Sequence, residues 1–210
     1  MTSAEPRVWL AALATVFERE RERLGRLDAV VGDGDHGASM ARGFAQAQEA
    51  VAANQEAVGP LLTTAGRAFM KGVGGASGPL FATLFLELGQ SAPERGSLDL
   101  TALRDGTRHA VERIQRLGRS KPGDKTMLDA LAPAADAIAR AADQQMPFAQ
   151  AVEVAAHAAE DGAEATRAMA AGQGRARFIE GQGVGQADPG ATSMALVFRV
   201  LADVVHGREA

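Results

Sequence analysis

The chain contains no cysteine among its 210 residues. This absence excludes disulfide bonds, thiolate metal sites and cysteine nucleophiles. Lysine and arginine form no concentrated run, and the formal net charge is −4. Because binding to a phosphate backbone needs a concentrated basic surface, we expect no nucleic-acid partner.

Long hydrophobic runs are also missing. The apolar stretch at residues 80–88 is far shorter than the roughly 20 residues that cross a bilayer, and the N-terminal residues lack the apolar segment of a secretory signal. We therefore expect no membrane association and a cytoplasmic location. With 46% hydrophobic and 23% charged residues, the chain is expected to form one globular domain over residues 1–210.

Apolar residues recur at helical spacing, and the alternation typical of strands is essentially absent. Proline at a helix start and glycine past its end bound several of these segments. A proline at position 133 should kink or divide the sixth helix. The pattern predicts eight helices, at about residues 5–24, 40–51, 60–72, 79–89, 100–118, 126 onward, 147–172 and 189–207.

The connections between these helices are of two kinds. Those after the odd-numbered helices are rich in glycine, whereas those near Asn54, Ala92 and Gln144 are plain polar turns. In an antiparallel array with short connections, all odd-to-even loops lie at one end. We therefore expect an all-α, up-and-down array whose functional rim is formed by four glycine-rich loops, at residues 32–37, 72–78, 118–125 and 172–190.

The first glycine-rich loop, Gly32-Asp33-Gly34-Asp35-His36-Gly37, carries the strongest chemical signal. Its carboxylates are hard oxygen ligands for Mg²⁺ or Ca²⁺, its glycines let the main chain approach a ligand, and the following helix start offers N–H groups to anions. The loop predicts a site for metal-bound phosphate. A Ca²⁺-stabilised loop of a helical binding module is the alternative, but it leaves the other three loops without a purpose.

Five motifs follow one another along the chain. They are Leu27-Asp28 with the Gly32 to Gly37 loop, Gly74-Gly75-Ala76-Ser77-Gly78-Pro79-Leu80, Pro122-Gly123-Asp124-Lys125-Thr126-Met127, Gly174-Arg175-Ala176 and Asp188-Pro189-Gly190-Ala191-Thr192-Ser193. In this order they resemble the motifs of the L subunit, the nucleotide-binding subunit, of dihydroxyacetone kinase. The resemblance covers nearly the whole chain, and it implies an eight-helix antiparallel barrel with the nucleotide bound at one rim.

The resemblance also implies roles for individual residues. Asp28, Asp33 and Asp35 match the aspartates that hold two Mg²⁺ ions against the phosphates of ADP or ATP, and no catalytic residue is separable from this site. Taken singly, such residues are more often turn, packing or solvated surface residues. The positions that match nucleotide contacts are His36, Gly37, Ala38, Ser39, Ala76, Ser77, Gly118, Met127, Arg175, Asp188, Pro189 and Gly190.

The implied activity is phosphoryl transfer to dihydroxyacetone or a related small ketose held on a separate K subunit. The donor is either free ATP or a bound ADP that a phosphotransferase-system protein rephosphorylates. The sequence leaves open the donor, the ketose and a homodimer, and the nucleotide domain of a related acyl or sugar kinase is a further alternative. Gly181-Gln182-Gly183 and Gln186 stand where many relatives carry Gly-Glu-Arg and a histidine, which puts engagement of the partner or donor in doubt.

Overall fold

The computed structural model of the chain describes residues 4–53, 57–75, 77–92 and 97–208. Over these residues the fold is all-helical, apart from one isolated antiparallel bridge between Ala4 and Leu98. None of the helices described is long and apolar enough to cross a membrane. The helices are α1 (Pro6–Arg19), α2 (Arg21–Ala29), α3 (His36–Ala52), α4 (Val58–Gly72), α5 (Ser77–Ser91), α6 (Leu100–Gly118), α7 (Leu128–Asp143), α8 (Phe148–Ala165) and α9 (Pro189–His206).

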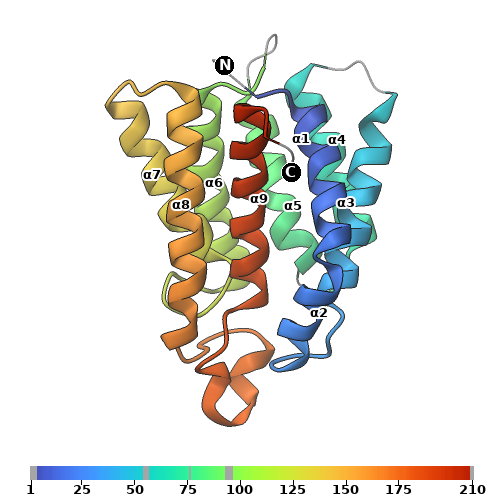
Figure 1. Ribbon diagram of the computed structural model, residues 1–210, viewed down its shortest axis with the longest axis vertical. Coiled ribbons are helices and arrows are strands. Elements are labelled where there is room, and N and C mark those ends of the chain that lie inside the picture. The colour runs from blue at the N-terminus through green and yellow to red at the C-terminus, as the bar shows by residue number, and fades with distance from the viewer. Residues whose placement is uncertain (1–3, 54–56, 76, 93–96, 209–210) are drawn as a thin grey trace.

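The helices form a closed ring (Figure 1). Each helix from α3 to α9 packs against the next one along the chain, while α1 packs against both α3 and α9. At the seam between the first and last helices, the indole N–H of Trp9 donates to the carbonyl of Val197 over 3.3 Å. The ring of contacts confirms the predicted antiparallel helical barrel.

Aromatic side chains fill the middle of this barrel. Trp9, Phe17, Phe44, Phe69 and Phe85 are all buried. The Phe44 ring lies 4.4 Å from Phe17, 4.8 Å from Phe69 and 5.9 Å from Phe85 between ring centroids. These rings join α1, α3, α4 and α5, and the same buried apolar cluster continues through α6 to α9.

The first predicted helix is bent into two segments, so the structure describes nine α-helices where the sequence predicted eight. Glu20 separates α1 from α2. The helical hydrogen bonds continue across it, since its N–H donates to Val16 and its carbonyl accepts from Leu24, each over 2.9 Å. The bend lets α2 lean on the start of α3.

Two other helix predictions differ from the structure. Pro133 does not divide α7, which runs unbroken through it. Proline removes the N–H that would pair with the Asp129 carbonyl, and α8 packs so closely there that a Cβ on Gly162 would lie 2.0 Å from that oxygen. The seventh predicted helix ends at Ala165 rather than near residue 172, because a short 3-10 turn follows at Thr166–Ala168.

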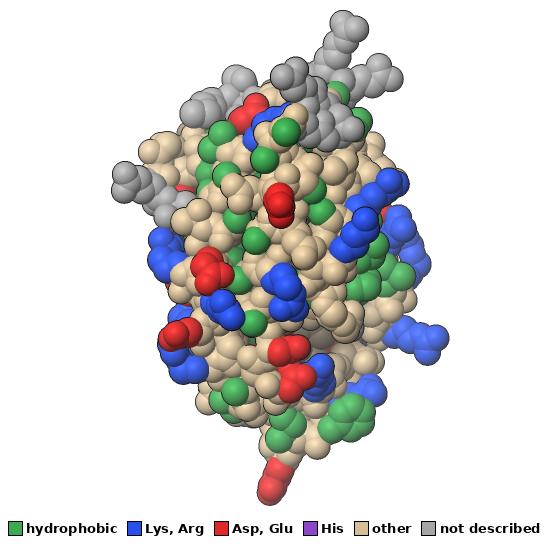
Figure 2. All heavy atoms as spheres, turned by 90° about the vertical axis from the view of Figure 1, so that its right-hand side faces the viewer, with side chains coloured by type: hydrophobic (Ala, Val, Ile, Leu, Met, Phe, Trp, Pro, Cys, Tyr) green, Lys and Arg blue, Asp and Glu red, His purple; other side chains and the backbone are tan. Residues whose placement is uncertain are grey.

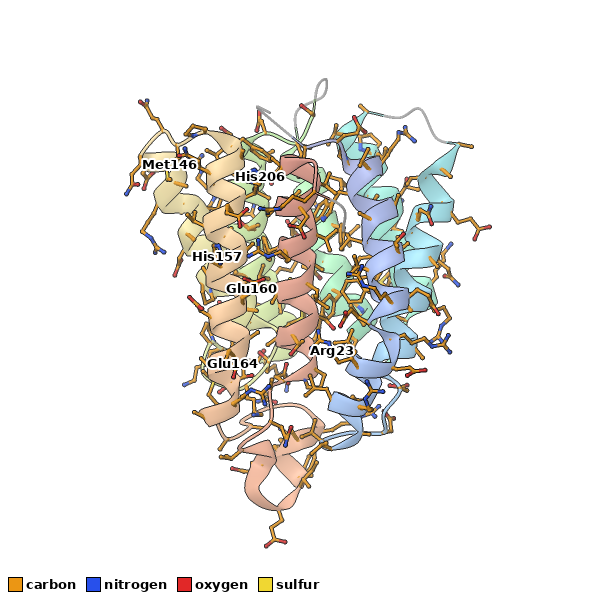
Figure 3. All side chains as sticks on the ribbon, viewed as in Figure 1. Arg23, Met146, His157, Glu160, Glu164 and His206 are labelled. Atoms are coloured by element: carbon orange, nitrogen blue, oxygen red, sulfur yellow. The ribbon has the colours of Figure 1, made fainter. Side chains whose placement is uncertain are left out.

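The glycine-rich connections α2–α3, α6–α7 and α8–α9 lie together at the lower end of the barrel in Figure 1. The α7–α8 turn, where Met146 is labelled in Figure 3, lies at the opposite end. The expected alternation of the two kinds of loop therefore holds for these connections. Asn54, expected at the plain end, lies outside the described residues.

Candidate functional site

Three carboxylates meet at the glycine-rich rim. Asp28 lies in the last turn of α2, while Asp33 and Asp35 lie in the loop that leads to α3, and one carboxylate oxygen from each is within 4.8 Å of the others. Gly34 turns the loop with φ +79°, which suits glycine. Oδ2 of Asp28 accepts the Gly34 N–H over 2.9 Å. The loop therefore folds around the Asp28 carboxylate.

The charges in this cluster are unevenly balanced. A hydrogen bond from the Arg175 guanidinium holds the pKa of Asp33 below its ordinary value. Burial, followed by the neighbouring Asp33 and Asp28 carboxylates, raises the pKa of Asp35. Three carboxylates paired with one guanidinium, that of Arg175, leave an excess of negative charge that suits Mg²⁺. Water and phosphate oxygens can fill the remaining coordination positions of the metal. The cluster fits a divalent cation, and Asp33 and Asp35 are exposed enough to receive one.

The start of α3 is packed tightly against α2. A Cβ on Gly37 would lie 1.9 Å from the Arg21 carbonyl oxygen and 2.7 Å from the Gly25 nitrogen, so only glycine fits there. Ala38 is half-buried and Ser39 is buried in the same first turn. The Ser39 N–H donates to the Asp35 carbonyl over 2.9 Å, whereas the N–H groups that precede it in a helix start lack helical partners. The sequence predicted a phosphate contact for this turn, and the geometry leaves its N–H groups beside the carboxylate cluster.

The His36 side chain faces the interior. Its Nε2 lies 2.8 Å from the Ser193 hydroxyl of α9, and burial lowers the pKa of the imidazole. The backbone N–H of His36, in contrast, points to Oδ2 of Asp28 at 3.4 Å. The ring therefore ties the start of α3 to the first turns of α9, and the expected phosphate or metal contact stays a prediction.

The start of α9 completes another side of the rim. Asp188 caps the helix, with its Oδ2 accepting the Ala191 N–H over 2.7 Å, and Pro189 follows in the first turn. Burial raises the pKa of Asp188 to about 7. A Cβ on Gly190 would lie 3.5 Å from the Met127 nitrogen, so the starts of α7 and α9 are in contact. The structure thus brings together two sets of predicted nucleotide contacts, Met127 and residues 188–190.

The start of α5 adjoins this group from the other side. Ser77 begins α5, and the ring of Phe81 lies 6.3 Å from the His36 ring between centroids. A Cβ on Gly118, at the end of α6, would lie 3.7 Å from the Leu80 side chain. Ala76, which the sequence placed in this phosphate-binding turn, lies outside the described residues.

Residues 169–187, which we call the rim segment, connect α8 to α9 and lie beside the α2–α3 loop at the lower end of the barrel (Figure 1). Arg175 in this segment pairs with Asp33, and Val31, Ala171 and Ala176 form a small buried apolar cluster beneath it. Gly181 and Gln182, where the sequence departs from the family pattern, have φ +71° and +48°. The departure therefore lies in a tight turn on the outside of the segment.

Sequence reasoning assigned no role to two buried polar side chains that organise the rim. Lys125 is 2% exposed, and its ammonium donates to the carbonyls of Thr166 and Gln186, each over 2.6 Å. The Asp129 carboxylate accepts the N–H groups of Gly123 and Thr126. The partners of these side chains are mostly backbone atoms, so no residue pattern signals the contacts.

The side of the barrel carries a cavity that is separate from the Asp28, Asp33 and Asp35 cluster. A cavity of about 250 Å³ lies between α2, α8 and α9, and its lining includes Arg23, Glu160 and Glu164, which are labelled in Figure 3. It contains none of the residues predicted to bind metal or nucleotide. On the face shown in Figure 2, basic side chains are interleaved with acidic ones.

The fold and the site define a closed helical barrel that presents a carboxylate cluster and several helix N-termini at one rim. The chain belongs to the DAK2 domain family, whose sequence model matches residues 30–203. It is 36% identical over 195 residues to the PEP-dependent dihydroxyacetone kinase, ADP-binding subunit DhaL, of Escherichia coli, covering 92% of this chain and 93% of that protein. The predicted resemblance is thereby confirmed.

Longer relatives contain the same unit. The chain is 40% identical over 197 residues to D-erythrulose kinase of Mycolicibacterium smegmatis, covering 92% of this chain but 34% of that protein. The crystal structure of the dihydroxyacetone kinase from C. freundii in complex with AMP-PNP and Mg²⁺ matches with a TM-score of 0.72 and 26% identity, over 97% of this chain and 34% of that one. This chain thus spans about a third of each of these two kinases, and the likeness confirms the all-helical fold class.

Proposed function

We propose that this chain is the nucleotide- and Mg²⁺-binding subunit of a kinase for dihydroxyacetone or a related small ketose. The observation that carries the proposal is the Asp28, Asp33 and Asp35 cluster beside the N-terminus of α3, at the rim where α5, α7 and α9 also begin. Helix N-termini attract phosphate, and three carboxylates attract the metal that accompanies it. The name of the E. coli relative supports ADP as the ligand.

Each part of the rim has a task in this proposal. The three aspartates hold two Mg²⁺ ions, as the family pattern implies. The bound cations would supply the positive charge that neutralises the phosphate oxygens. The N–H groups at the start of α3, together with Ser77, donate to the phosphates. Arg175 adds a positive charge beside Asp33.

The nucleoside half of the ligand is proposed to lie toward α7 and α9. Gly118 and Met127 would flank the adenine, while Asp188, Pro189 and Gly190 close the site at the start of α9. The contact between Gly190 and the Met127 backbone supports this grouping, because it brings two separately predicted motifs to one place. The remaining predicted contacts, Gly37, Ala38 and Ser39, belong to the phosphate half.

The ketose is proposed to be held by a separate K-type subunit. Orienting a small ketose and moving its hydroxyl proton needs a base within hydrogen-bonding reach, and the one histidine at the described part of the rim, His36, has its ring buried against Ser193. The E. coli relative is named PEP-dependent, which favours a bound ADP that a phosphotransferase-system protein rephosphorylates over exchange of free ATP. A cytoplasmic location is part of this proposal.

Calorimetric titration with ADP, with and without Mg²⁺, tests the metal and nucleotide site. We expect the parent to bind ADP in a Mg²⁺-dependent manner and Asp35→Asn to lose this binding while keeping its helical circular dichroism. Asp33→Asn should behave alike, although it also breaks the pair with Arg175. Glu180→Gln removes an exposed carboxylate of the rim segment outside the cluster, and serves as the matched control.

Undiminished Mg-ADP binding by Asp35→Asn would show that these carboxylates are wrongly assigned. If chelators lower the melting temperature and ADP never raises it, a Ca²⁺-stabilised binding module is the better interpretation.

A coupled assay of ketose phosphate formation tests the two-subunit proposal. We expect no turnover of dihydroxyacetone by this chain alone, and turnover only after a K-type subunit and the phosphoryl donor are added. A site shared between two chains excludes water only once assembled, which protects the activated phosphate from hydrolysis. Robust turnover by the isolated chain would contradict the proposal and require a ketose site within this barrel.

A further inference from the structure

Lys125 is a buried cation at the junction of three segments of the rim. It is 2% exposed, and its backbone has φ +59°, in the left-handed region that non-glycine residues seldom adopt. Burying an ammonium group is costly unless it is hydrogen-bonded and paired. Its Nζ donates to two backbone carbonyls, those of Thr166 and Gln186, each over 2.6 Å. A strained backbone and a desolvated charge are therefore maintained together at one position beside the site.

The two carbonyls lie at opposite ends of the α8–α9 connection. Thr166 follows the end of α8, and Gln186 lies just before the cap of α9. The Thr166 hydroxyl adds a further link, because it accepts the Asp188 N–H over 2.8 Å. The ammonium group thus holds the α6–α7 connection, the end of α8 and the start of α9 in one arrangement.

The charges around Lys125 favour this arrangement. The Asp188 carboxylate attracts the ammonium group, and Arg167 repels it more weakly than Asp188 attracts it. Asp129 adds a smaller attraction. The contact to residue 186 is made by its carbonyl, so the glutamine that replaces the family's histidine leaves it intact. This explains how the rim keeps its form despite the departure from the family pattern.

The hydrogen bonds from Lys125 to the Thr166 and Gln186 carbonyls, which we call the Lys125 tether, lie close to the starts of α7 and α9. Met127 follows Lys125 by two residues, and a Cβ on Gly190 would lie 3.5 Å from the Met127 nitrogen. The tether therefore fixes the spacing between the starts of α7 and α9, where the nucleoside is proposed to bind. The carboxylate loop is held by hydrogen bonds from its own backbone to Asp28, and its link to the rim segment is the pair between Asp33 and Arg175.

We infer that Lys125 is a positioning residue that sets the affinity of the rim for the nucleoside part of its ligand, and leaves the metal and phosphate part unchanged. The inference rests on the proposed function. It separates two halves of the site by the hydrogen bonds that build them. It assigns the nucleoside half to one side chain that does not touch the ligand.

Titration calorimetry with Mg-ADP and with Mg-pyrophosphate, which lacks the nucleoside, tests this inference. Lys125→Met keeps most of the side-chain volume and removes the ammonium group, and we expect Mg-ADP binding to weaken about tenfold or more, since hydrogen bonds to a charged group are lost. Mg-pyrophosphate binding should change less than about twofold. Lys125→Arg, which keeps the charge and the donors, should restore most of the affinity for ADP.

Lys121→Met is the matched control, because Lys121 is exposed in the same connection. It should bind both ligands as the parent does. Thr166→Val removes the hydroxyl that accepts the Asp188 N–H, and Thr166→Ser keeps it. We expect the valine variant to show the same selective loss of ADP affinity, and the serine variant to retain it. These two variants decide the question if Lys125→Met does not fold.

Binding of the two ligands by the parent protein distinguishes failure of this inference from failure of the proposed function. A parent protein that binds neither ligand refutes the proposed function and, with it, the inference. If the parent binds both, ADP binding that is unchanged in Lys125→Met overturns the inference alone. Equal weakening of ADP and pyrophosphate also overturns it, because Lys125 would then support the whole fold and not the nucleoside half. A Thr166→Val protein with no selective loss of ADP affinity would overturn the inference as well.

Discussion

Replacing Gly37 by alanine sets two opposing effects against each other. Alanine is favoured over glycine within a helix by about 1 kcal/mol, so propensity alone predicts a more stable protein. The added Cβ, however, would lie 1.9 Å from the Arg21 carbonyl oxygen and 2.7 Å from the Gly25 nitrogen. Both neighbours are backbone atoms, and no rotamer change can relieve the contact. The α2 and α3 helices must therefore separate.

The clash should outweigh the propensity. Inserting a methyl group into packed structure costs about 1–3 kcal/mol, and the upper end applies because two backbones have to move. After subtracting the gain in propensity, about 2 kcal/mol of net destabilisation remains, which lowers the melting temperature of a chain of this length by about 4–8 °C. Because Asp28 lies in the last turn of α2, separation of the helices should also weaken Mg-ADP binding.

Thermal melts followed by circular dichroism, together with ADP titrations, measure both effects. Gly74→Ala is the matched control, since a Cβ on Gly74 meets nothing within 4 Å and the residue has no positive φ. We expect its stability to stay within about 0.5 kcal/mol of the parent. A Gly37→Ala protein that melts at or above the parent temperature would refute the packing argument.

Further predictions concern the helices away from the rim. Hydrogen bonds from Arg199 and then Arg208 lower the pKa of Glu153 to about 2 from 4.5, so its contribution to stability is complete above pH 4.5 and is lost as the pH falls toward 2. After allowance for solvent screening this is about 1 kcal/mol, and Glu153→Gln should flatten the melting temperature in that window; a parallel fall in parent and variant would contradict it. Asp99→Ala removes the N-cap that accepts the Ala102 N–H over 2.8 Å, and should lower stability by about 1 kcal/mol. Its Mg-ADP affinity should equal that of the parent, and a loss of affinity would show that the barrel couples its two ends.

The fold could be predicted from the sequence wherever the signal is local. Apolar spacing along one face marks each helix, and proline and glycine mark several ends. The bend at Glu20 carries no such mark, because the helical hydrogen bonds continue through it and no proline or glycine stands there. The early end of α8 depends on Thr166, whose hydroxyl bonds to the distant Asp188 N–H. Tertiary contacts, and not local preference, decide both features.

The candidate site divides in the same way. Asp33 and Asp35 are adjacent to a helix start and to each other, so their convergence could be read from spacing. The pairing of Arg175 with Asp33 joins segments that only the folded barrel brings together. Lys125 reaches carbonyls 41 and 61 residues away, and a backbone carbonyl has no residue type to recognise. The resemblance to a family supplied positions there, but not the contacts that hold them.

The seam between α1 and α9 bears on the order in which the protein can assemble. The carboxylate loop is synthesised early, yet the hydroxyl that meets the His36 ring belongs to Ser193, and the ring of helices closes only when Trp9 reaches Val197. A chain still emerging from the ribosome therefore holds its aspartates without the helix that completes the rim. Nucleotide binding should appear only after α9 has emerged, so the ligand favours chains that contain α9 over chains that lack it.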